Sequence, residues 1–444
     1  MVRPRPGPPR RARLSPAYGQ PRNKRARSRT DPGAVGSGSD PDTVGDVTEI
    51  ESFPVNIPEH DLKDLRERLG RVRLPEAETV QDGTQGIGLA RLRSLLDAWG
   101  AHDWRSLEGR WNAIPHYRTC LDGLNIAFWH VRSPEAGAFP LVLTHGWPGS
   151  VLEFESVIGP LTDPVAHGGA AEDAFDVVIP ALPGFGFSER PREPGWNPGR
   201  TARAWADLMT RLGYERFGAH GGDWGAPVSI DLARLEPERV AALHLTMPFA
   251  SPLPEDLAAA SDAEKRMIAK RDAFMMTGPT HAIVQSVLPQ TLGYSLLDSP
   301  AGLAAWLGQA LVDFSDTRPE AGGGVSVAQQ VDNIALYWFT GTGASAARWY
   351  WEAVRATPRS AQAQNEETVT VPTAFTLFPG EPYPTARRWA ENRYRNIISW
   401  NEMEYGGHYA GWEKPGLLVS ALRNAFRQAR NRQGPTDPVM ASSL

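Results

Sequence analysis

The sequence predicts an α/β fold built on a mostly parallel sheet, with helices on both faces and a helical insertion. Three observations lead to this prediction. Short apolar runs alternate with segments of helical pattern, as in parallel sheets whose strands are joined by helical crossovers. Two of these runs end in glycine-rich loops, HGWPGS (145–150) and GGDWGA (221–226). The alternation stops over 249–367, a mostly helical stretch rich in aromatic side chains, and then resumes.

Composition bounds the class of protein. A chain of 444 residues with 41% hydrophobic residues and 15 tryptophans is long enough for one large domain with an insertion, or for two domains. The single cysteine, Cys120, excludes an internal disulfide and suits a reducing compartment, so we predict a cytoplasmic location. We predict no membrane span, because no run of about 18 apolar residues occurs.

Charge is unevenly distributed along the chain. Residues 1–30 hold nine arginines, one lysine and no acidic residue, so this segment carries +10 while the formal net charge of the whole chain is −5. The remainder therefore carries −15, which argues against nucleic acid as a partner. Residues 1–48 have the composition of a disordered basic tail and linker, or of a start placed too far upstream, and they lack the apolar stretch of a signal peptide.

The region after this tail is predicted to hold two amphipathic helices and a hairpin. In DLKDLRERL (61–69) leucines recur at helical spacing, and 89–99 repeats the pattern. Two short strands flank Asp122-Gly123, a dipeptide typical of tight hairpin turns.

The core is predicted from short apolar runs and the helical segments between them. The predicted strands lie within 139–146, 175–186, 215–223, 240–248, 368–379 and 395–403. The predicted core helices are 197–213, 226–237 and 414–430. This order divides the chain into a tail and linker (1–48), an amino-terminal region (49–130), a first core segment (131–248), a helical lid (249–367), a second core segment (368–430) and a flexible C-terminus (431–444).

The loop GGDWGA contains the frame Gly-x-nucleophile-x-Gly, which in the α/β-hydrolase fold presents a side chain on a sharp strand-to-helix turn. Asp223 occupies the central position, Glu381 follows a later strand, and His408 lies in the loop YGGHYA. The order nucleophile, acid, histidine is the order of that fold, and ligands of parallel sheets bind beyond the carboxyl ends of the strands. The alternative is a tight turn in which Asp223 only caps the following helix.

A carboxylate nucleophile selects the substrate chemistry. It attacks acyl carbon poorly, but it can displace a leaving group at saturated carbon and form an alkyl ester. Water activated by His408, with Glu381 orienting the imidazole, can then hydrolyse that ester. The backbone N–H groups of Trp147 and Trp224 are candidate donors to the oxyanion. These residues favour an alkylating substrate, such as an epoxide or an alkyl halide.

The two electrophiles differ in what leaves. An epoxide opens to an alkoxide and needs a proton donor opposite Asp223, a role that a tyrosine hydroxyl suits. A halide needs only N–H donors. The candidates in the helical lid are Tyr294, Tyr337 and Tyr350, and packing is the alternative role for each of them.

Taken together, these motifs resemble the microsomal-type epoxide hydrolases and their bacterial relatives, over Phe53 to about Phe426. The blocks that carry the resemblance include FPVNIPEHDLKDLRERL, HGWPGS, GGDWGA, LLDSPAGLAAW, ALYWFTGT, FPGE and GGHYAGWEKP. The resemblance implies an α/β-hydrolase fold with a helical lid and an amino-terminal segment that wraps the core and the lid.

The resemblance also implies the roles of the site residues. Asp223 is expected to be the nucleophile, and His408 and Glu381 the pair that activates water. The amides of Trp147 and Trp224 are expected to form the oxyanion hole. No cofactor and no metal ion are implied.

The lid donors match the family only partially. RWY, ending at Tyr350, falls where the family has its second epoxide-polarising tyrosine. The first belongs to a block like Gly-Tyr-x-His, about eight residues before a Pro-x-Thr. Here Pro-x-Thr is present at 289–291, and the corresponding position is His281. His281 can donate through its N–H or act as an imidazolium. The alternatives are that Tyr294 supplies the first donor in its place, or that the site works with Tyr350 as its single donor.

The leading hypothesis is an epoxide hydrolase that converts a bulky apolar or aromatic epoxide to a vicinal diol through an Asp-linked ester. An epoxide-opening cyclase and a catalytically silent binding protein are the alternatives, and a dehalogenase fits less well. The expected partner is a small-molecule epoxide, and a homodimer is a further hypothesis.

Overall fold

The computed structural model describes residues 49–277, 280–356 and 367–432. The predicted basic tail, 1–48, lies outside the described residues, as does nearly all of the predicted C-terminus, 431–444.

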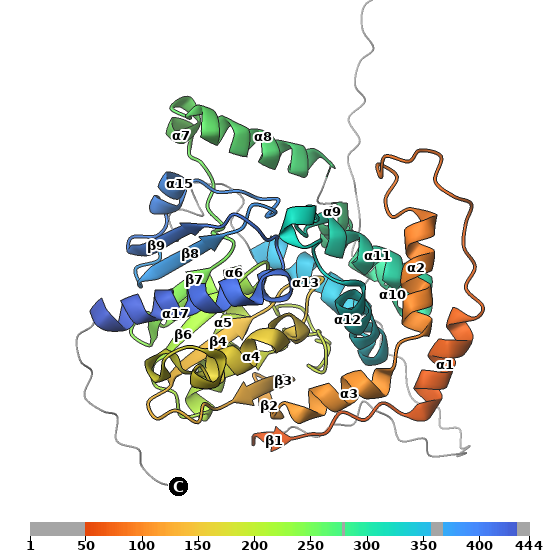
Figure 1. Cartoon of the computed structure of the whole chain (residues 1–444), viewed down its shortest axis with the longest axis horizontal. Coiled ribbons are helices and arrows are strands. Elements are labelled where there is room, and N and C mark those ends of the chain that lie inside the picture. The colour runs from red at the N-terminus through yellow and green to blue at the C-terminus, as the bar shows by residue number, and fades with distance from the viewer. Residues whose placement is uncertain (1–48, 278–279, 357–366, 433–444) are drawn as a thin grey trace, which may run out of the picture. The chain divides into compact units, whose positions relative to one another are not determined.

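One sheet of nine strands forms the centre of the described chain, in the order β1-β2-β3-β5-β4-β6-β7-β8-β9 (Figure 1). The first three strands and the contact of β3 with β5 are antiparallel, and β4 to β9 all run parallel. The strands are β1 Glu51–Ser52, β2 His116–Leu121, β3 Leu124–Val131, β4 Phe139–Thr144, β5 Phe175–Pro180, β6 Phe217–Gly221, β7 Val240–Leu245, β8 Thr373–Leu377 and β9 Ile397–Glu402. The predicted mostly parallel sheet is confirmed.

The antiparallel edge begins with the predicted hairpin. Strands β2 and β3 pair over their whole length, with Leu121 opposite Leu124. The turn residues Asp122 and Gly123 have φ of 48° and 76°. Both values lie in the left-handed region that a two-residue hairpin turn requires, which explains the Asp-Gly sequence.

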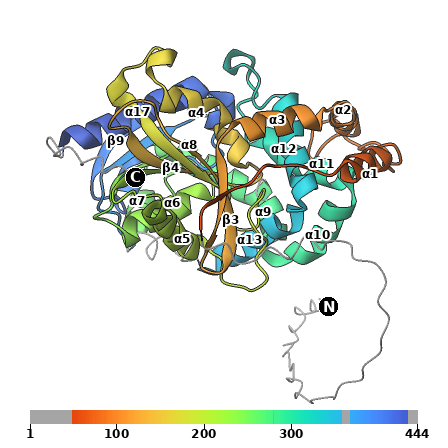
Figure 2. The ribbon, with the colours of Figure 1, turned by 90° about the horizontal axis from the view of Figure 1, so that it is seen from below.

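Helices cover both faces of the sheet. Helices α4 and α17 lie on one face, and α5 and α6 lie on the other (Figures 1 and 2). These helices are α4 Glu155–Thr162, α5 Pro198–Arg211, α6 Gly225–Leu235 and α17 Pro415–Arg432. The three predicted core helices are confirmed. Helix α4 was not predicted, because its eight residues include Gly159 and Pro160, which obscure a helical pattern.

The lid is a set of helices inserted between β7 and β8. It comprises α7 Pro254–Ala258, α8 Asp262–Thr277, α9 Thr280–Val287, α10 Pro289–Asp298, α11 Pro300–Asp313, α12 Val327–Thr340 and α13 Gly343–Ala356. The turn from α12 to α13 is sharp because Gly341 ends α12 with φ of 61°. This turn sets the direction of α13, the helix that carries Tyr350.

The amino-terminal helices pack against the lid (Figure 1). They are α1 Glu59–Leu69, α2 Leu89–Gly100 and α3 Trp104–Ala113. Aromatic side chains pack α2 and α3 against α12. The ring centroids of Trp99 and Trp338 lie 5.8 Å apart, and the ring centroids of Trp104 and Phe339 lie 4.5 Å apart. The predicted helices 61–69 and 89–99 are confirmed, whereas α3 was not predicted as a separate helix.

Candidate active site

Three side chains from loops after parallel strands meet at the carboxyl edge of the sheet. Asp223 follows β6, Glu381 follows β8, and His408 follows β9. Nδ1–H of His408 donates to Oε2 of Glu381 at 2.7 Å, and Nε2 of His408 lies 3.3 Å from Oδ2 of Asp223. The sequence predicted this convergence because the carboxyl ends of parallel strands share one edge.

The turn that carries Asp223 requires glycine at positions 221 and 225. Asp223 has φ of 44°, a strained value for a residue with a Cβ. A Cβ on Gly225 would lie 1.8 Å from the carbonyl oxygen of Thr144, and one on Gly221 would lie 2.1 Å from that of Gly225. Helix α6 begins at Gly225 without a side-chain cap. The alternative interpretation, that Asp223 caps this helix, is therefore wrong.

The loop after β4 contributes a backbone donor to the Asp223 carboxylate. The N–H of Trp147 donates to Oδ1 of Asp223 at 2.8 Å. His145 holds this loop, since its Nε2 accepts from the N–H of Leu182 at 3.1 Å and its Nδ1 bonds the carbonyl of Gly146. Burial lowers the pKa of His145 to about 4, so this imidazole is neutral and structural.

Two carboxylates determine the charge of His408. Burial alone would lower its pKa, but the charges of Glu381 and Asp223 outweigh burial and raise the pKa of His408 well above its ordinary value. The side chain of His408 is 5% exposed and that of Asp223 is 23% exposed. The carboxylate is thus the more accessible of the two partners.

Lid residues close the site above Asp223. The ring of Tyr350 meets the ring of Trp224 edge-on at 4.9 Å and that of Trp147 at 5.7 Å. His281 stacks flat on Trp147 at 4.8 Å and meets Tyr350 edge-on at 5.7 Å. Tyr350 and His281, the two predicted lid donors, thus contact each other and Trp147, whose N–H donates to the predicted nucleophile.

The protonation states of these lid residues follow from burial. Burial, with the negative charge of Asp223 adding to it, raises the pKa of Tyr350 well above its ordinary value. Burial lowers the pKa of His281 to about 4. At neutral pH both groups are therefore neutral hydrogen-bond donors, and the imidazolium form expected as one option for His281 is disfavoured.

The other two candidate tyrosines lie elsewhere. The hydroxyl of Tyr337 donates to the carbonyl of Gly149 at 2.9 Å, so this side chain supports the loop after β4. Tyr294 is 68% exposed on α10. For Tyr337 the packing alternative is the better description, and the structure brings His281, not Tyr294, to the site.

Comparisons with known proteins agree with this geometry. A family model described as "Epoxide hydrolase N terminus" matches residues 50–154, and one described as "alpha/beta hydrolase fold" matches 140–293. A candidate epoxide hydrolase of Stigmatella aurantiaca (strain DW4/3-1) is 45% identical over 86% of this chain and 86% of its own length. "Epoxide hydrolase 1" of Sus scrofa is 33% identical over 87% of this chain and 90% of its own length. The chain belongs to the microsomal-type epoxide hydrolase family.

Solved structures show the same architecture. The Aspergillus niger epoxide hydrolase superposes with a TM-score of 0.76 at 29% identity, covering 86% of this chain and 98% of that one. The juvenile hormone epoxide hydrolase of the silkworm Bombyx mori superposes with a TM-score of 0.78 at 25% identity, covering 87% and 96%. The α/β-hydrolase fold that the sequence predicts is therefore confirmed.

Among the described residues of this epoxide hydrolase, no helix has the length and apolar character needed to cross a membrane. The cytoplasmic location and the homodimer stay predictions.

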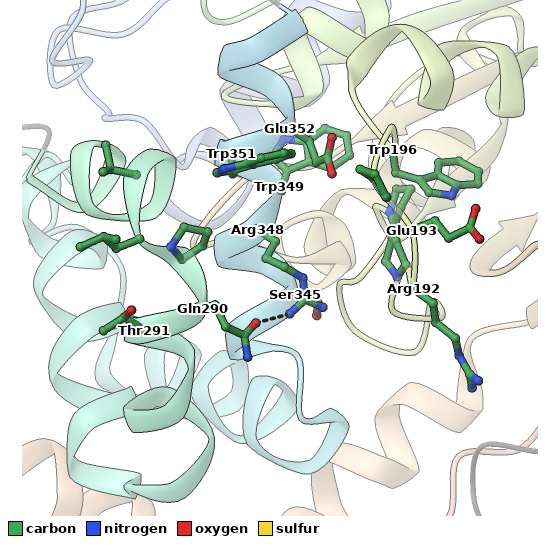
Figure 3. A pocket seen from close by; sticks show the side chains of 16 residues that line it. Arg192, Glu193, Trp196, Gln290, Thr291, Ser345, Arg348, Trp349, Trp351 and Glu352 are labelled. Atoms are coloured by element: carbon green, nitrogen blue, oxygen red, sulfur yellow. Dashed lines mark hydrogen bonds between the residues drawn. The ribbon is translucent and has the colours of Figure 1, made fainter. Parts of the chain in front are cut away.

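A pocket of about 440 Å³ opens beside the lid of this epoxide hydrolase. It lies between the junction of α9 and α10, helix α13 and the loop after β5 (Figure 3). Trp196, Trp349 and Trp351 line it together with proline and aliphatic side chains, and Arg348 bonds Gln290 across one wall at 3.1 Å. The walls are thus largely apolar, with charged groups at a few points.

One side chain of this pocket contacts the turn that carries Asp223. Trp349, which lines the pocket, meets the ring of Trp224 at 6.5 Å, and Trp224 directly follows Asp223. Tyr350 is the next residue on the same helix. Helix α13 therefore faces the pocket with one side and the catalytic edge with the other.

Sequence reasoning missed a carboxyl group in the site. Glu153, in the short 3-10 helix Val151–Phe154, lines a small cavity together with Asp223 and His408. Burial raises the pKa of Glu153 to about 8, the Asp223 and Glu413 carboxylates add to the rise, and His408 opposes it. The available signal was a single acid in the apolar run VLEF.

We expect Glu153→Gln to stabilise the protein at neutral pH. Between pH 4.5 and about 8, the unfolded chain loses the Glu153 proton while the folded chain keeps it, so the free energy of unfolding falls as pH rises. Glutamine removes this penalty, by about 2–4 kcal/mol at pH 8. Urea unfolding of variant and parent at pH 5 and pH 8 checks it. The control Glu155→Gln, whose carboxylate accepts from Arg110 at 3.1 Å, should show no such gain. Equal pH profiles for the parent and Glu153→Gln would contradict the assignment.

Proposed function

We propose that this enzyme opens a bulky apolar or aromatic epoxide through an ester of Asp223 and releases a vicinal diol. The observation that carries the proposal is the arrangement of opposed groups. Asp223 lies beside His408, which bonds Glu381. Tyr350 and His281 contact each other in the lid, close enough to Asp223 for its charge to act on the pKa of each. A nucleophile on one side and neutral donors on the other suit an epoxide, whose oxygen needs a proton as its carbon is attacked.

In the first step Oδ2 of Asp223 attacks an epoxide carbon and the carbon–oxygen bond of the ring breaks. Oδ1 is engaged by the N–H of Trp147, so Oδ2 is the oxygen free to act as nucleophile. The hydroxyl of Tyr350 transfers its proton to the alkoxide, while the N–H of His281 donates a hydrogen bond. The products are a neutral hydroxyalkyl ester and a tyrosinate.

In the second step water hydrolyses this ester. His408 Nε2 takes a proton from water as the water oxygen bonds to Cγ of Asp223, and the oxyanion forms at Oδ1 beside the N–H of Trp147, with the N–H of Trp224 as the second expected donor. The bond from Cγ to the alkyl oxygen then breaks, and His408 gives its proton to the leaving alkoxide. The carboxyl proton of Asp223 returns to Tyr350, which restores the enzyme.

Ester formation also prepares His408 for the second step. The negative charges of both Asp223 and Glu381 raise its pKa in the free enzyme. An ester at Asp223 carries no charge, so the pKa of His408 falls once the substrate is attached. The imidazolium therefore releases its proton to solvent and becomes a free base at the stage that needs one, and it takes a proton up again when the Asp223 carboxylate is restored.

We expect Tyr350→Phe to slow ester formation by about 10²–10³-fold, the size of a lost general acid. Hydrolysis of an ester once formed should change far less, since the alkoxide is already protonated. Rapid mixing with an aryl epoxide, followed by acid quenching and intact mass, measures the two rate constants separately. Tyr294→Phe is the matched control. Loss of ester formation in the Tyr294 variant rather than the Tyr350 variant would sink this assignment.

The substrate class is inferred from the lid pocket. Aromatic and proline walls next to Trp349 favour an apolar or aryl group on the epoxide. Leu288 lines this pocket and is 57% exposed, so the larger side chain of a Leu288→Trp variant reduces the pocket volume without disturbing the buried core. We expect this variant to raise KM for aryl epoxides while leaving small alkyl epoxides unchanged. Leu257→Trp, on α7 at 48% exposed, is the control, and equal effects on both substrate groups would contradict the inference.

A further inference from the structure

The cavity beside the catalytic residues is sized for one small molecule. Its volume is about 10 Å³, and Glu153, Asp223 and His408 are among its lining residues. A polar cavity of this size holds roughly one water molecule if several partners surround it. No epoxide fits into this space.

Two polar groups on the wall of this cavity lack hydrogen-bond partners. The half-buried carboxyl of Glu153 makes no hydrogen bond to any other described residue. Nε2 of His408 is buried, and its contact with Asp223 at 3.3 Å does not meet hydrogen-bond geometry. A buried nitrogen such as Nε2 of His408 is seldom left unpaired, and a water between it and the Glu153 carboxyl would bond to both.

The backbone around the cavity makes room for both carboxyl groups. A Cβ on Gly149 would lie 2.8 Å from Oε2 of Glu153, and a Cβ on Gly146 would lie 2.1 Å from Oδ1 of Asp223. Both glycines belong to the loop HGWPGS. The loop that supplies the Trp147 N–H thus also leaves the space for Glu153.

We propose that Glu153 binds the water that hydrolyses the Asp223 ester. This inference rests on the proposed ester mechanism. The water donates one hydrogen to Nε2 of His408 and the other to the carbonyl oxygen of the Glu153 carboxyl, which directs a lone pair at Cγ of Asp223. Only the proton that His408 takes is transferred, so Glu153 keeps its own proton throughout the step.

The neutral form of Glu153 suits this position. The groups that face it are Asp223 and Glu413, which favour the protonated acid, and His408, which opposes it. A second full negative charge beside the developing oxyanion would disfavour the transition state. A neutral carboxyl accepts from water without adding that charge.

The test separates formation of the ester from its hydrolysis in two variants. Glu153→Leu removes the acceptor, and Glu153→Gln keeps a carbonyl oxygen at the same place. We expect the leucine variant to hydrolyse the ester at least about tenfold more slowly, and the glutamine variant within about threefold of the parent. Ester formation should be unchanged in both, so the fraction of enzyme present as ester at steady state should rise above the parental value only in the leucine variant. Acid-quenched intact mass with styrene oxide reads both quantities, and thermal unfolding checks the fold.

Other outcomes overturn the inference in distinguishable ways. Parental hydrolysis in the leucine variant would show that Glu153 does not act on the water. Equal slowing in the glutamine variant would mean that an acceptor oxygen is not what matters. Glu155→Gln, two residues along the chain, is the matched control and should behave as the parent. If the His408→Gln variant forms no ester with any epoxide, the ester mechanism itself fails rather than the role of Glu153.

Discussion

Asp223→Asn is expected to lower kcat/KM for every epoxide by at least about 10⁴-fold. The amide keeps the shape of the carboxylate, and its oxygen can still accept from the N–H of Trp147. Its nitrogen is a far weaker nucleophile towards saturated carbon, so the ester cannot form. Diol production measured by chromatography, together with thermal unfolding of the variant, checks this prediction.

The control for this variant is Asp207→Asn, at an exposed position on α5, which should keep parental activity. Activity of the Asp223 variant within about tenfold of the parent would mean that water adds to the epoxide directly, with His408 as the base. The site would then be an acid–base pair, and the strained turn at Asp223 would need another explanation.

His408→Gln is expected to form the ester and then stop. Glutamine cannot accept a proton from water, so hydrolysis should fall by about 10³–10⁴-fold while attack by Asp223 continues. Intact mass should rise by one substrate, and multiple turnover should be lost. The double variant with Asp223→Asn should show no mass gain. If the His408→Gln variant unfolds like the parent but gains no mass, the assigned roles are contradicted.

The positions of Asp223, Glu381 and His408 at the carboxyl edge of the sheet could be predicted from the sequence because local sequence features determine them. The frame around Asp223 specifies a strained turn, and the glycines at 221 and 225 are required by the carbonyls they approach. Glu381 and His408 follow strands that end at the same edge, so their order along the chain was enough to bring them together. Little beyond the parallel sheet had to be known.

The lid could not be read in the same way. Tyr337 and Tyr350 are separated by 13 residues in similar aromatic surroundings. Tyr337 nevertheless bonds a backbone carbonyl, whereas Tyr350 packs on Trp224, the residue after Asp223. The turn at Gly341, between the two helices, decides which side each presents. His281 owes its position to stacking on Trp147, a contact between distant segments of the chain. Helix packing of this kind leaves no local pattern.

Glu153 illustrates a further limit of local patterns. A lone acid in an apolar segment is usually solvent-exposed or paired. Only the fold brings this one to a cavity shared with Asp223 and His408, where burial raises its pKa to about 8.

The ester mechanism is the central claim, and one turnover in ¹⁸O-labelled water tests it most directly. With enzyme in excess over an aryl epoxide, the oxygen added to the product comes from Asp223 and the water oxygen enters the carboxyl group. We therefore predict unlabelled diol and a peptide containing Asp223 that is heavier by one ¹⁸O. Labelled diol and an unlabelled peptide after the first turnover would contradict the account.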